Sequence, residues 1–429
     1  MTEALSAGWI AAQRWFRAKQ RPIATVAEAD RAPLAAGVDL RVVEVAYADG
    51  GGPDHYLLLL VDGREPADGD GGWRRLLGAI ADDAVLRGSA GRFVARRTDA
   101  LADLVPSAHE ASAVLSERRL RVEQSNTSVV LGDRLILKLF RLLEPGLNPD
   151  LEIGAFLTET GFADTPPMAG GITWHPDGGE PAAAAMLQAL VPARGDAWAA
   201  MLEHLATDPE RATRAAADIG RVTAAMHDAL ASRPDHPDFP ARPATVDETA
   251  RWRASAEHQL AQAVTAVAGR EHDRLVALAP AATARFADSF GRATGEATVS
   301  RVHGDYHLGQ ILARADGGYS VIDFEGEPAR PLAERRSPGS PLRDVAGLVR
   351  SLDYAARTAQ RDAGLDADAW LNEARAAFVD GYGGIAPEER GLLEAFELEK
   401  ACYEVRYEAN NRPDWLWLPM AAVERLVAA

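Results

Sequence analysis

Two short segments in the last third of the chain carry residue types suited to phosphoryl transfer. Residues 303–310 read H-G-D-Y-H-L-G-Q, and residues 321–325 read V-I-D-F-E. They place a carboxylate at Asp305, an amide at Gln310 and a second carboxylate at Asp323. A carboxylate can accept the proton of an attacking hydroxyl, while amide and carboxylate oxygens can hold Mg²⁺ against nucleotide phosphates. The pattern therefore predicts Asp305 as a general base, and Gln310 and Asp323 as Mg²⁺ ligands.

The spacing of these three side chains is typical of protein kinases, which place a catalytic Asp, an Mg²⁺-binding Asn and the Asp of D-F-G at the same two intervals. Residues 311–324 read as a strand, a tight turn at 316–318 and a second strand. Such a hairpin would bring the two ends of the motif together. A zinc site at His303 and His307 is the alternative, but Gly304 would break the helix that such a pair requires.

Composition narrows the class of protein further. The 429 residues suffice for two or three lobes, and the formal net charge of −17 makes nucleic acid and anionic membranes unsuitable partners. The single cysteine, Cys402, excludes an intramolecular disulfide and fits a reducing compartment. No apolar run approaches the roughly 20 residues that span a bilayer, and no secretory leader is visible. We therefore expect a cytoplasmic protein.

Lysine is rare in this chain, which uses arginine at almost all of its basic positions; the three lysines are Lys19, Lys138 and Lys400. A lysine in the interior of a strand is then a candidate for a role that needs a compact point charge. Lys138 lies in the apolar segment 134–140, which reads as a strand. We predict that Lys138 binds the nucleotide, and we interpret Lys19 and Lys400 as ordinary surviving lysines.

The nucleotide phosphates need a cradle other than a glycine-rich loop, because the chain has neither G-x-G-x-x-G nor a Walker A motif. A polar turn just upstream of Lys138 can supply one through backbone N–H groups and short side chains. Its residues are Gln124, Ser125, Asn126, Thr127 and Ser128. A helix should begin at Asn148-Pro149, and Glu152 in its first turn would pair with Lys138; a helix-dipole role for Glu152 is the alternative. Residues 188–191 would be the hinge that meets adenine, with a plain connector as the alternative.

The order of patterns predicts a β-rich first half and a helical second half, joined near Val191-Pro192. The first hundred residues alternate strand-like runs with turns rich in Gly, Asp and Pro. Beyond residue 192, apolar residues recur at helical spacing in alanine-rich sequence. The helices expected there are 197–205, 209–230, 246–268, 281–292, 340–360, 367–382 and 387–410. This is the layout of an α+β, bilobal, protein-kinase-like fold.

The last of these helices combines aromatic and polar side chains of the kind that bind sugars, which present hydroxyls and an apolar face. The substrate-binding candidates are Tyr407, Glu408, Asn411, Arg412 and Trp415, and we add His303 beside the expected base. Tyr403 recurs on the same helical face, and we interpret it as core. Core packing of the aromatic residues is the alternative to a pocket for the others.

Longer strings resemble one family, the maltokinases, in the aminoglycoside phosphotransferase-like branch of the protein-kinase-like superfamily. The similar segments span the chain; they are 13–16, 123–128, 148–152, 301–310, 322–328, 331–336, 340–346 and 411–415. The resemblance implies ATP- and Mg²⁺-dependent phosphorylation of maltose at its anomeric hydroxyl. The product, maltose 1-phosphate, would feed α-glucan (glycogen) synthesis.

The resemblance also implies an N-terminal cap subdomain at 1–103, a kinase-like N-lobe at 104–192 and a helical C-lobe at 193–429. It implies a monomer that associates with an enzyme interconverting trehalose and maltose, and it gives Asp344 the task of bracing the catalytic loop. Two alternatives stay open. One is a kinase of the same fold acting on glucosamine or an aminoglycoside. The other is a nucleotide-binding regulatory pseudokinase, which the presence of every catalytic candidate disfavours.

Overall fold

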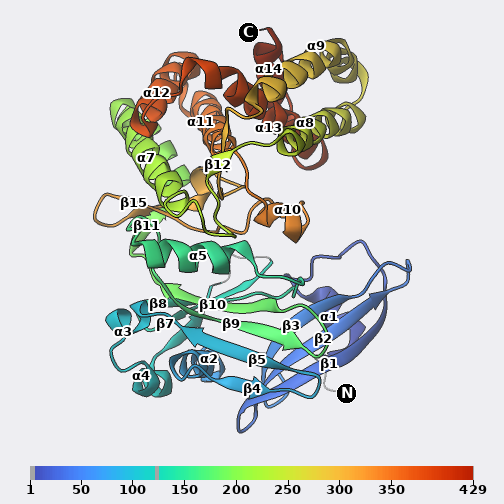
Figure 1. The fold of residues 1–429 in the computed structure, drawn as a ribbon, viewed down its shortest axis with the longest axis vertical. Coiled ribbons are helices and arrows are strands. Elements are labelled where there is room, and N and C mark those ends of the chain that lie inside the picture. Colours follow the sequence, from blue (N-terminus) through green and yellow to red (C-terminus); the bar gives the residue numbers. More distant parts are fainter. Residues whose placement is uncertain (1–4, 121–124, 429) are drawn as a thin grey trace. The chain divides into compact units, whose positions relative to one another are not determined.

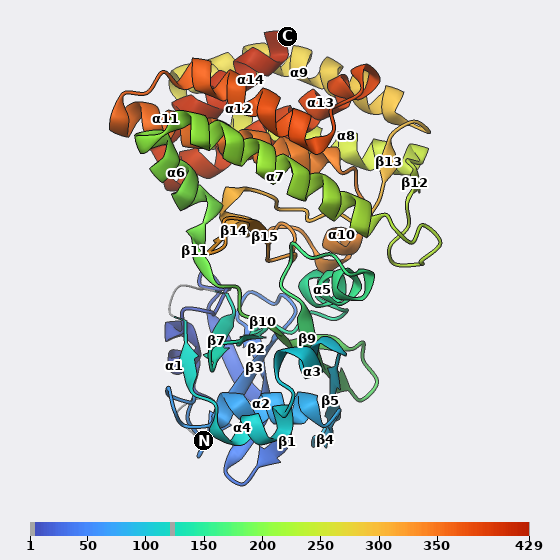
Figure 2. The same cartoon turned by 90° about the vertical axis from the view of Figure 1, so that its left-hand side faces the viewer.

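The computed structural model describes residues 5–120 and 125–428, and its fold is α+β (Figures 1 and 2). The chain divides into two compact units. Unit 1 comprises Met1–Val191 with Pro331–Glu334, and unit 2 comprises Pro192–Arg330 with Arg335–Ala429. Strands dominate unit 1 and helices dominate unit 2. The predicted α+β class, with a β-rich first part and a mostly helical second part, is confirmed.

Unit 1 contains two antiparallel sheets, of order β1-β2-β3 and β4-β5-β9-β10-β8-β7-β6. The strands are β1 (Ile23–Ala35), β2 (Val38–Tyr47), β3 (Asp54–Val61), β4 (Val85–Arg87), β5 (Gly91–Arg97), β6 (Glu117–Arg119), β7 (Thr127–Leu131), β8 (Leu135–Leu139), β9 (Met168–Pro176) and β10 (Ala182–Ala189). The helices are α1 (Ala7–Ala12), α2 (Gly72–Ala81), α3 (Ala100–Leu104), α4 (Ala108–Val114) and α5 (Pro149–Thr160).

One hydrophobic core joins the two sheets of unit 1 through α2. Val42 of β2 and Leu57 of β3 belong to the same buried cluster as Trp73 of α2. Phe93 of β5 and Leu137 of β8 complete it from the seven-stranded sheet. All five side chains are completely buried, so the two sheets and α2 are held together by apolar contact on a large scale.

The second face of the three-stranded sheet is buried as well. Tyr56, Leu58 and Leu60 of β3 point to this side, where they pack with Trp15 and Phe16 from the start of the chain. A strand covered on both faces needs apolar residues at every position rather than at alternate ones. This explains why β3 reads as an uninterrupted apolar run in the sequence.

Backbone pairing also connects residues 1–103 to the rest of unit 1. β5 pairs with β9 over its whole length, although β5 lies within the predicted cap at 1–103 and β9 beyond it. The chain after β8 pairs with β3, because Leu57 N–H donates to Arg141 O at 2.7 Å and Leu143 N–H donates to His55 O at 2.8 Å. Residues 1–103 therefore share a continuous hydrogen-bonded network with the rest of unit 1. A functional boundary between 103 and 104 stays a prediction.

Unit 2 consists of helices around one small sheet of order β11-β14-β15 and a two-stranded pair, β12-β13. The strands are β11 (Ala193–Asp196), β12 (Arg242–Pro243), β13 (Thr298–Val299), β14 (Ile311–Arg314) and β15 (Tyr319–Val321). The helices, apart from 3₁₀ turns, are α6 (Ala197–Thr207), α7 (Pro209–Leu230), α8 (Val246–Ala266), α9 (Gly269–Ala293), α10 (Leu332–Arg336, which straddles the unit boundary), α11 (Leu342–Ala363), α12 (Ala367–Tyr382), α13 (Arg390–Asn411) and α14 (Trp417–Ala428).

Several elements were not predicted, among them β9 and α14, and two of the differences have a clear physical reason. β1 was not predicted, because its sequence is rich in alanine and charge, and most of its side chains are exposed or only partly buried. Helix α9 begins at Gly269 and runs through Pro280, whereas the sequence predicts a helix only from residue 281. Pro280 removes one backbone donor from the helix, but buried Leu275 and Phe286 on either side hold both halves against the core.

Helices α7 and α12 approach each other through glycines. A Cβ on Gly220 would lie 2.2 Å from Phe378 O and 2.9 Å from Tyr382 N, and a Cβ on Gly381 would lie 2.2 Å from Ala217 O. These neighbours are backbone atoms and cannot swing aside. The two helices can therefore lie this close only because neither residue has a side chain.

Replacing Gly220 should separate α7 from α12 and destabilise the protein. We expect Gly220→Ala to cost about 1–3 kcal/mol of unfolding free energy, which is the usual range for overpacking a core. Gly291→Ala in α9 is the matched control, since nothing lies within 4 Å of its Cβ position; it should stabilise the helix by about 0.5–1 kcal/mol. Urea denaturation of both variants tests this. Equal stability of the two variants would contradict it.

Candidate active site

The loop that carries Asp305 is held by one buried carboxylate. Asp344, in the first turn of α11, accepts backbone N–H groups from His303 at 2.8 Å and Gly304 at 2.9 Å, and lies 3.1 Å from His227 Nε2. Only 1% of Asp344 is exposed. Burial alone would raise the pKa of Asp344, but His227 and these donors lower it below its usual range. The contacts of Asp344 are those expected of a residue that braces the catalytic loop.

Asp305 contacts Lys400 of α13, a residue interpreted from the sequence as an ordinary lysine. Lys400 Nζ donates to Asp305 Oδ1 at 3.3 Å, and the two side chains are 27% and 21% exposed. Burial alone would raise the pKa of Asp305, but the Lys400 ammonium, followed by His307 and His303, lowers it below its ordinary value. Asp305 is therefore a carboxylate at neutral pH, able to accept a proton.

His303, predicted to bind substrate, is instead part of the scaffold. Its ring is buried, with 1% exposure of the residue. Nε2 donates to Ile322 O at 3.0 Å, Nδ1 accepts from the backbone N–H of Asp305 at 3.4 Å, and the ring packs on Phe324 with centroids 4.9 Å apart. Both ring nitrogens are thus engaged, which contradicts a role in substrate binding. His303 ties the loop of Asp305 to the loop of Asp323.

The predicted hairpin is present and brings the two ends of the motif together. β14 pairs with β15, and the backbone N–H of Ile322 donates to Gln310 O at 3.0 Å. Asp323 has a φ of +66°, a left-handed conformation that few residues other than glycine adopt and that often marks functional positions. This backbone conformation fixes the direction of the Asp323 side chain two residues after the end of β15.

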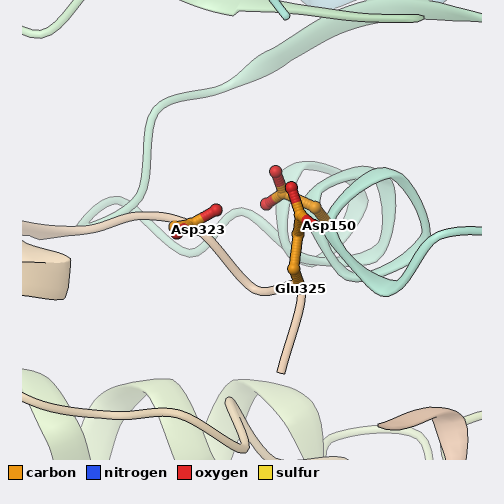
Figure 3. A group of neighbouring side chains, drawn as sticks. All are labelled: Asp150, Asp323 and Glu325. Atoms are coloured by element: carbon orange, nitrogen blue, oxygen red, sulfur yellow. The ribbon is translucent and has the colours of Figure 1, made fainter. Parts of the chain in front are cut away.

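A second carboxylate accompanies Asp323 on this loop. Figure 3 shows Asp323 and Glu325 on the segment that follows β15, and it also labels Asp150 on α5. Ligand oxygens of Asp323 and Glu325 lie within 4.8 Å of one another. Two neighbouring carboxylates offer oxygen donors, which suit Mg²⁺ rather than zinc, and an amide oxygen from Gln310 would keep the donor set all-oxygen. The residues present therefore fit the magnesium that the sequence predicts, with Glu325 as an additional candidate ligand.

A cavity lies beside Asp305 within unit 2, and charged side chains make up much of its wall. Besides Asp305, those are Glu327, Arg330, Arg343, Asp344, Glu399 and Lys400; Gln259 and Tyr403 also line it. All of these charges except that of Asp344 are paired. Arg330 contacts Glu327 at 2.7 Å, and Arg343 contacts Glu399 at 3.0 Å, just as Lys400 contacts Asp305. The cavity thus offers many hydrogen-bonding groups and little unbalanced charge.

The five acceptor candidates on the last turns of α13 and beyond do not line this cavity. Glu408 is 1% exposed, accepts from Arg412 Nη2 at 2.6 Å, and receives the Tyr354 hydroxyl at 3.0 Å. That arrangement contradicts Glu408 as an acceptor for sugar hydroxyls. Trp415 stacks on Tyr354, with ring centroids 6.4 Å apart. Tyr407 is 44% exposed and Asn411 is also exposed; for Tyr407, Asn411, Arg412 and Trp415 a substrate role stays a prediction.

Tyr403 and Lys400 reach the cavity because they lie earlier on α13, one to two turns before the predicted group. A helix advances about 5.4 Å per turn, so two turns separate the predicted group from the cavity-lining part of α13 by roughly 10 Å. The sequence singled out this helix but not the turn that contacts Asp305, since periodicity alone does not say which turn meets that loop.

The nucleotide half of the predicted site lies in unit 1. Lys138 on β8 donates to Asp150 Oδ2 at 2.8 Å, and only 8% and 3% of the two residues are exposed. The N-cap prediction is confirmed, because the Asn148 side chain accepts the backbone N–H of Asp150 at 2.9 Å. Glu152, the predicted partner of Lys138, lies two residues further along α5 and is partly exposed. Asp150 is thus one carboxylate in contact with Lys138, and the pairing of Glu152 with Lys138 stays a prediction.

The predicted phosphate turn is only partly described. Gln124 lies outside the described residues, whereas Ser125 is partly exposed and Asn126 is buried. Ser128 pairs with Lys138 across β7 and β8, so their side chains share one face of the sheet. Thr127 pairs with Leu139 and points to the opposite face. The hydroxyl of Thr127 therefore does not share a face with Lys138, which separates it from the other nucleotide candidates.

Sequence reasoning missed Lys400, Asp150 and Glu325, and each had a signal. Lys400 is one of three lysines in an arginine-rich chain, and the argument that singled out Lys138 applied to it equally. Asp150 precedes Glu152 in the same helical turn, so either carboxylate could have been assigned to Lys138. Glu325 stands two residues beyond Asp323, and a second carboxylate this close in the sequence is a candidate for the same metal ion.

Comparisons with known proteins find similarity over most of the chain. Residues 116–379 match the phosphotransferase enzyme family, and residues 9–91 match the maltokinase N-terminal cap domain. A glucosamine kinase of Streptacidiphilus jiangxiensis is 32% identical over 332 residues, 72% of this chain and 73% of that protein. One from Mycolicibacterium smegmatis is 30% identical over 72% of this chain and 79% of that protein. A solved glucosamine kinase in complex with glucosamine, ADP and inorganic phosphate is 28% identical, with a TM-score of 0.75 over 99% of this chain and 98% of that chain.

Membrane insertion finds no support in the helices. Within residues 5–120 and 125–428, no helix combines the length and the apolar character needed to cross a bilayer. The longest helix, α9, spans 25 residues but is interrupted by charged side chains along its length.

The contact between Lys400 and Asp305 predicts a change in pH dependence. In Lys400→Met the cation that holds the pKa of Asp305 down is absent, so that pKa should rise. The acidic limb of the kcat/KM profile should then move to higher pH, because a base with a raised pKa is protonated earlier as pH falls. Lys400→Arg, which keeps the positive charge, is the control and should leave the limb near its original position. An unmoved limb in Lys400→Met would show that the ammonium does not set the ionisation of Asp305.

Proposed function

The chain belongs to the phosphotransferase enzyme family, and on that premise we propose that it transfers the γ-phosphoryl group of ATP to a hydroxyl of a small sugar. The observation that carries the proposal is the Asp305 carboxylate, which is ionised, held by Lys400 and open to a cavity rich in hydrogen-bonding groups. The relatives with printed names support a sugar as the acceptor, since they are glucosamine kinases.

In the proposed reaction Asp305 accepts the proton of the sugar hydroxyl while the hydroxyl oxygen attacks the γ-phosphorus. The bond between that phosphorus and the β,γ-bridging oxygen breaks, and ADP leaves. Asp323, Glu325 and Gln310 would hold Mg²⁺, which would neutralise charge on the nucleotide phosphates. Lys138, oriented by Asp150, would add a compact positive charge to the phosphates.

We propose maltose as the sugar, phosphorylated at its anomeric hydroxyl. The match of residues 9–91 to the maltokinase cap domain supports this choice. The charges of the cavity support it independently, because Asp305, Glu327 and Glu399 each already contact a cation. The fourth carboxylate of the wall, Asp344, is 1% exposed and accepts the backbone N–H groups of His303 and Gly304. Every carboxylate of the wall thus already has partners, so an amino sugar would have to share one of them for its ammonium group, whereas a neutral disaccharide needs only hydrogen bonds.

Glucosamine is the second candidate, favoured by the named relatives and by the solved complex that contains glucosamine and ADP.

The other elements of the proposal follow from the maltose assignment. Maltose 1-phosphate would supply α-glucan synthesis, and an enzyme that interconverts trehalose and maltose would be a partner. A monomer in the cytoplasm is expected from the sequence and is proposed on that basis.

The acceptor is tested by steady-state kinetics with ATP, Mg²⁺ and a panel of maltose, glucose, glucosamine and an aminoglycoside. We expect the highest kcat/KM with maltose, and a product that no longer reacts as a reducing sugar, because its anomeric hydroxyl is esterified. Asp305→Asn should lower kcat about 10²–10⁴-fold with whichever sugar is preferred, as loss of a general base does. A preference for glucosamine would overturn the maltose assignment and leave the sugar kinase proposal intact.

The nucleotide half has its own test. Lys138→Arg keeps the charge but replaces a compact ammonium with a wider planar group beside buried Asp150, so kcat/KM for ATP should fall at least about tenfold. Lys19→Arg is the matched control, since Lys19 is exposed and donates only to backbone carbonyls. Similar kinetics for the two variants would remove Lys138 from the proposed site.

A further inference from the structure

Arg141 is a completely buried guanidinium that joins distant segments of unit 1. Its Nε donates to Thr127 Oγ1 at 2.8 Å, and its Nη1 donates to Leu57 O at 3.3 Å and lies 2.7 Å from Glu65 Oε1. The guanidinium carbon also sits 5.0 Å from the ring centroid of Trp15. Leu57, Glu65 and Trp15 all lie within the stretch that matches the maltokinase cap domain, whereas Thr127 opens β7.

A second arginine closes the same network. Arg119 Nη2 donates to Thr127 Oγ1 at 3.3 Å, and Arg119 Nη1 lies 3.1 Å from Glu65 Oε2. The Glu65 carboxylate thus spans both guanidinium groups, and the Thr127 hydroxyl accepts from both. Thr127 is 2% exposed, so its side chain is committed to these contacts.

Keeping a charge at Arg141 is costly. The residue is 0% exposed, and its Nη2 has no hydrogen-bond partner in the structure as described. Burial lowers the pKa of Arg141, and Glu65 opposes that shift. An apolar side chain of similar volume would avoid both the desolvation of a charge and the unsatisfied donor. Because burying the charge of Arg141 costs folding free energy, we expect the residue to have a role besides packing.

The register of β7 against β8 indicates what that role is. Ser128 and Lys138 form a cross-strand pair on one face, and the next pair, Thr127 and Leu139, lies on the other. Leu139 belongs to the core that the seven-stranded sheet shares with α2. Two neighbouring residues of β7 therefore point to opposite faces of the sheet. Ser128 lies on the same face as Lys138, whereas Thr127 points to the core and is hydrogen-bonded there.

We propose that Arg141 is a positioning residue for nucleotide binding, and that through Thr127 it couples the cap-matching segment to the turn that holds the phosphates. The proposal rests on the proposed function and on the sequence prediction that the turn containing Ser125 to Ser128 binds the phosphates. Backbone N–H groups bind an anion only when the chain presents them together, so the end of the turn must be fixed. Hydrogen bonds from two arginines to one side chain fix it at Thr127.

The test uses Thr127 in the full-length protein, because changing it leaves the buried guanidinium in place. Thr127→Val keeps the shape of the side chain and removes the acceptor oxygen, whereas Thr127→Ser keeps the oxygen. We expect Thr127→Val to raise KM for ATP about five- to tenfold, part of the effect of losing a hydrogen bond to a charged group, with KM for the sugar unchanged. Thr127→Ser should restore a KM for ATP close to that of the wild type.

Thr173→Val is the matched control for stability. Thr173 lies on β9 of the same sheet, and its hydroxyl contacts His175 at 2.9 Å. This variant should lower the melting temperature without changing KM for ATP. If Thr127→Val behaves like Thr173→Val and changes only the melting temperature, Thr127 is a structural contact and the proposal is overturned.

Arg141→Lys provides a second, independent measurement. It should raise KM for ATP, and the double variant Arg141→Lys/Thr127→Val should show little further increase, because both changes break one contact. Additive effects would overturn the coupling.

Ser128→Ala and Lys138→Arg distinguish a failure of this proposal from a failure of the predicted nucleotide site. If they raise KM for ATP while Thr127→Val does not, only the coupling fails; if neither changes it, the nucleotide site is placed wrongly and the coupling falls with it.

Discussion

The buried carboxylate of Asp344 is the interaction on which the catalytic half of the molecule depends. It binds the backbone of the catalytic loop directly and reaches α12 through His227, whose Nδ1 lies 2.9 Å from the Tyr382 hydroxyl. His303 continues the chain of hydrogen bonds to Ile322, next to Asp323. Three parts of the sequence separated by many residues are thus aligned by polar contacts in the interior, where such contacts are strong and unsatisfied ones are costly. Helix packing brings the segments near, and this network sets their orientation.

Charge pairing governs the chemistry that the site can perform. Lys400 keeps Asp305 ionised but lies close enough to weaken it as a base, because a depressed pKa means a lower affinity for the proton. A sugar hydroxyl is a poor acid, so the proton would transfer late, after the oxygen has begun to bond to phosphorus. Positioning and charge neutralisation at the phosphates then carry most of the rate enhancement, which is the usual division of labour in phosphoryl transfer.

The parts of the site fixed by local sequence could be predicted, and those fixed by long-range packing could not. Asp305, Gln310 and Asp323 were predictable because one hairpin joins them, and the cap of α5 was predictable from Asn148-Pro149. Three other features depend on contacts between distant segments. They are the contact of Lys138 with Asp150, the turn of α13 that meets Asp305, and the burial of His303. Spacing in the sequence carries no information about those contacts. The anchoring of Thr127 needed the register of β7 against β8, which the sequence alone leaves undetermined.

The pairing of β5 with β9 limits how this molecule can be divided. The two family matches end at residue 91 and resume at 116, as though a first module could be exchanged for another. Apart from Gly91, β5 lies inside that gap, so removing the chain up to the predicted boundary at residue 103 would take β5 away from Gly170–Pro176 of β9 and leave the N–H and C=O groups of that segment as an open edge. Such edges recruit strands from other molecules and lead to aggregation. The first module is therefore an inseparable part of the fold, and recombination in this lineage would have to exchange the entire segment up to Val191.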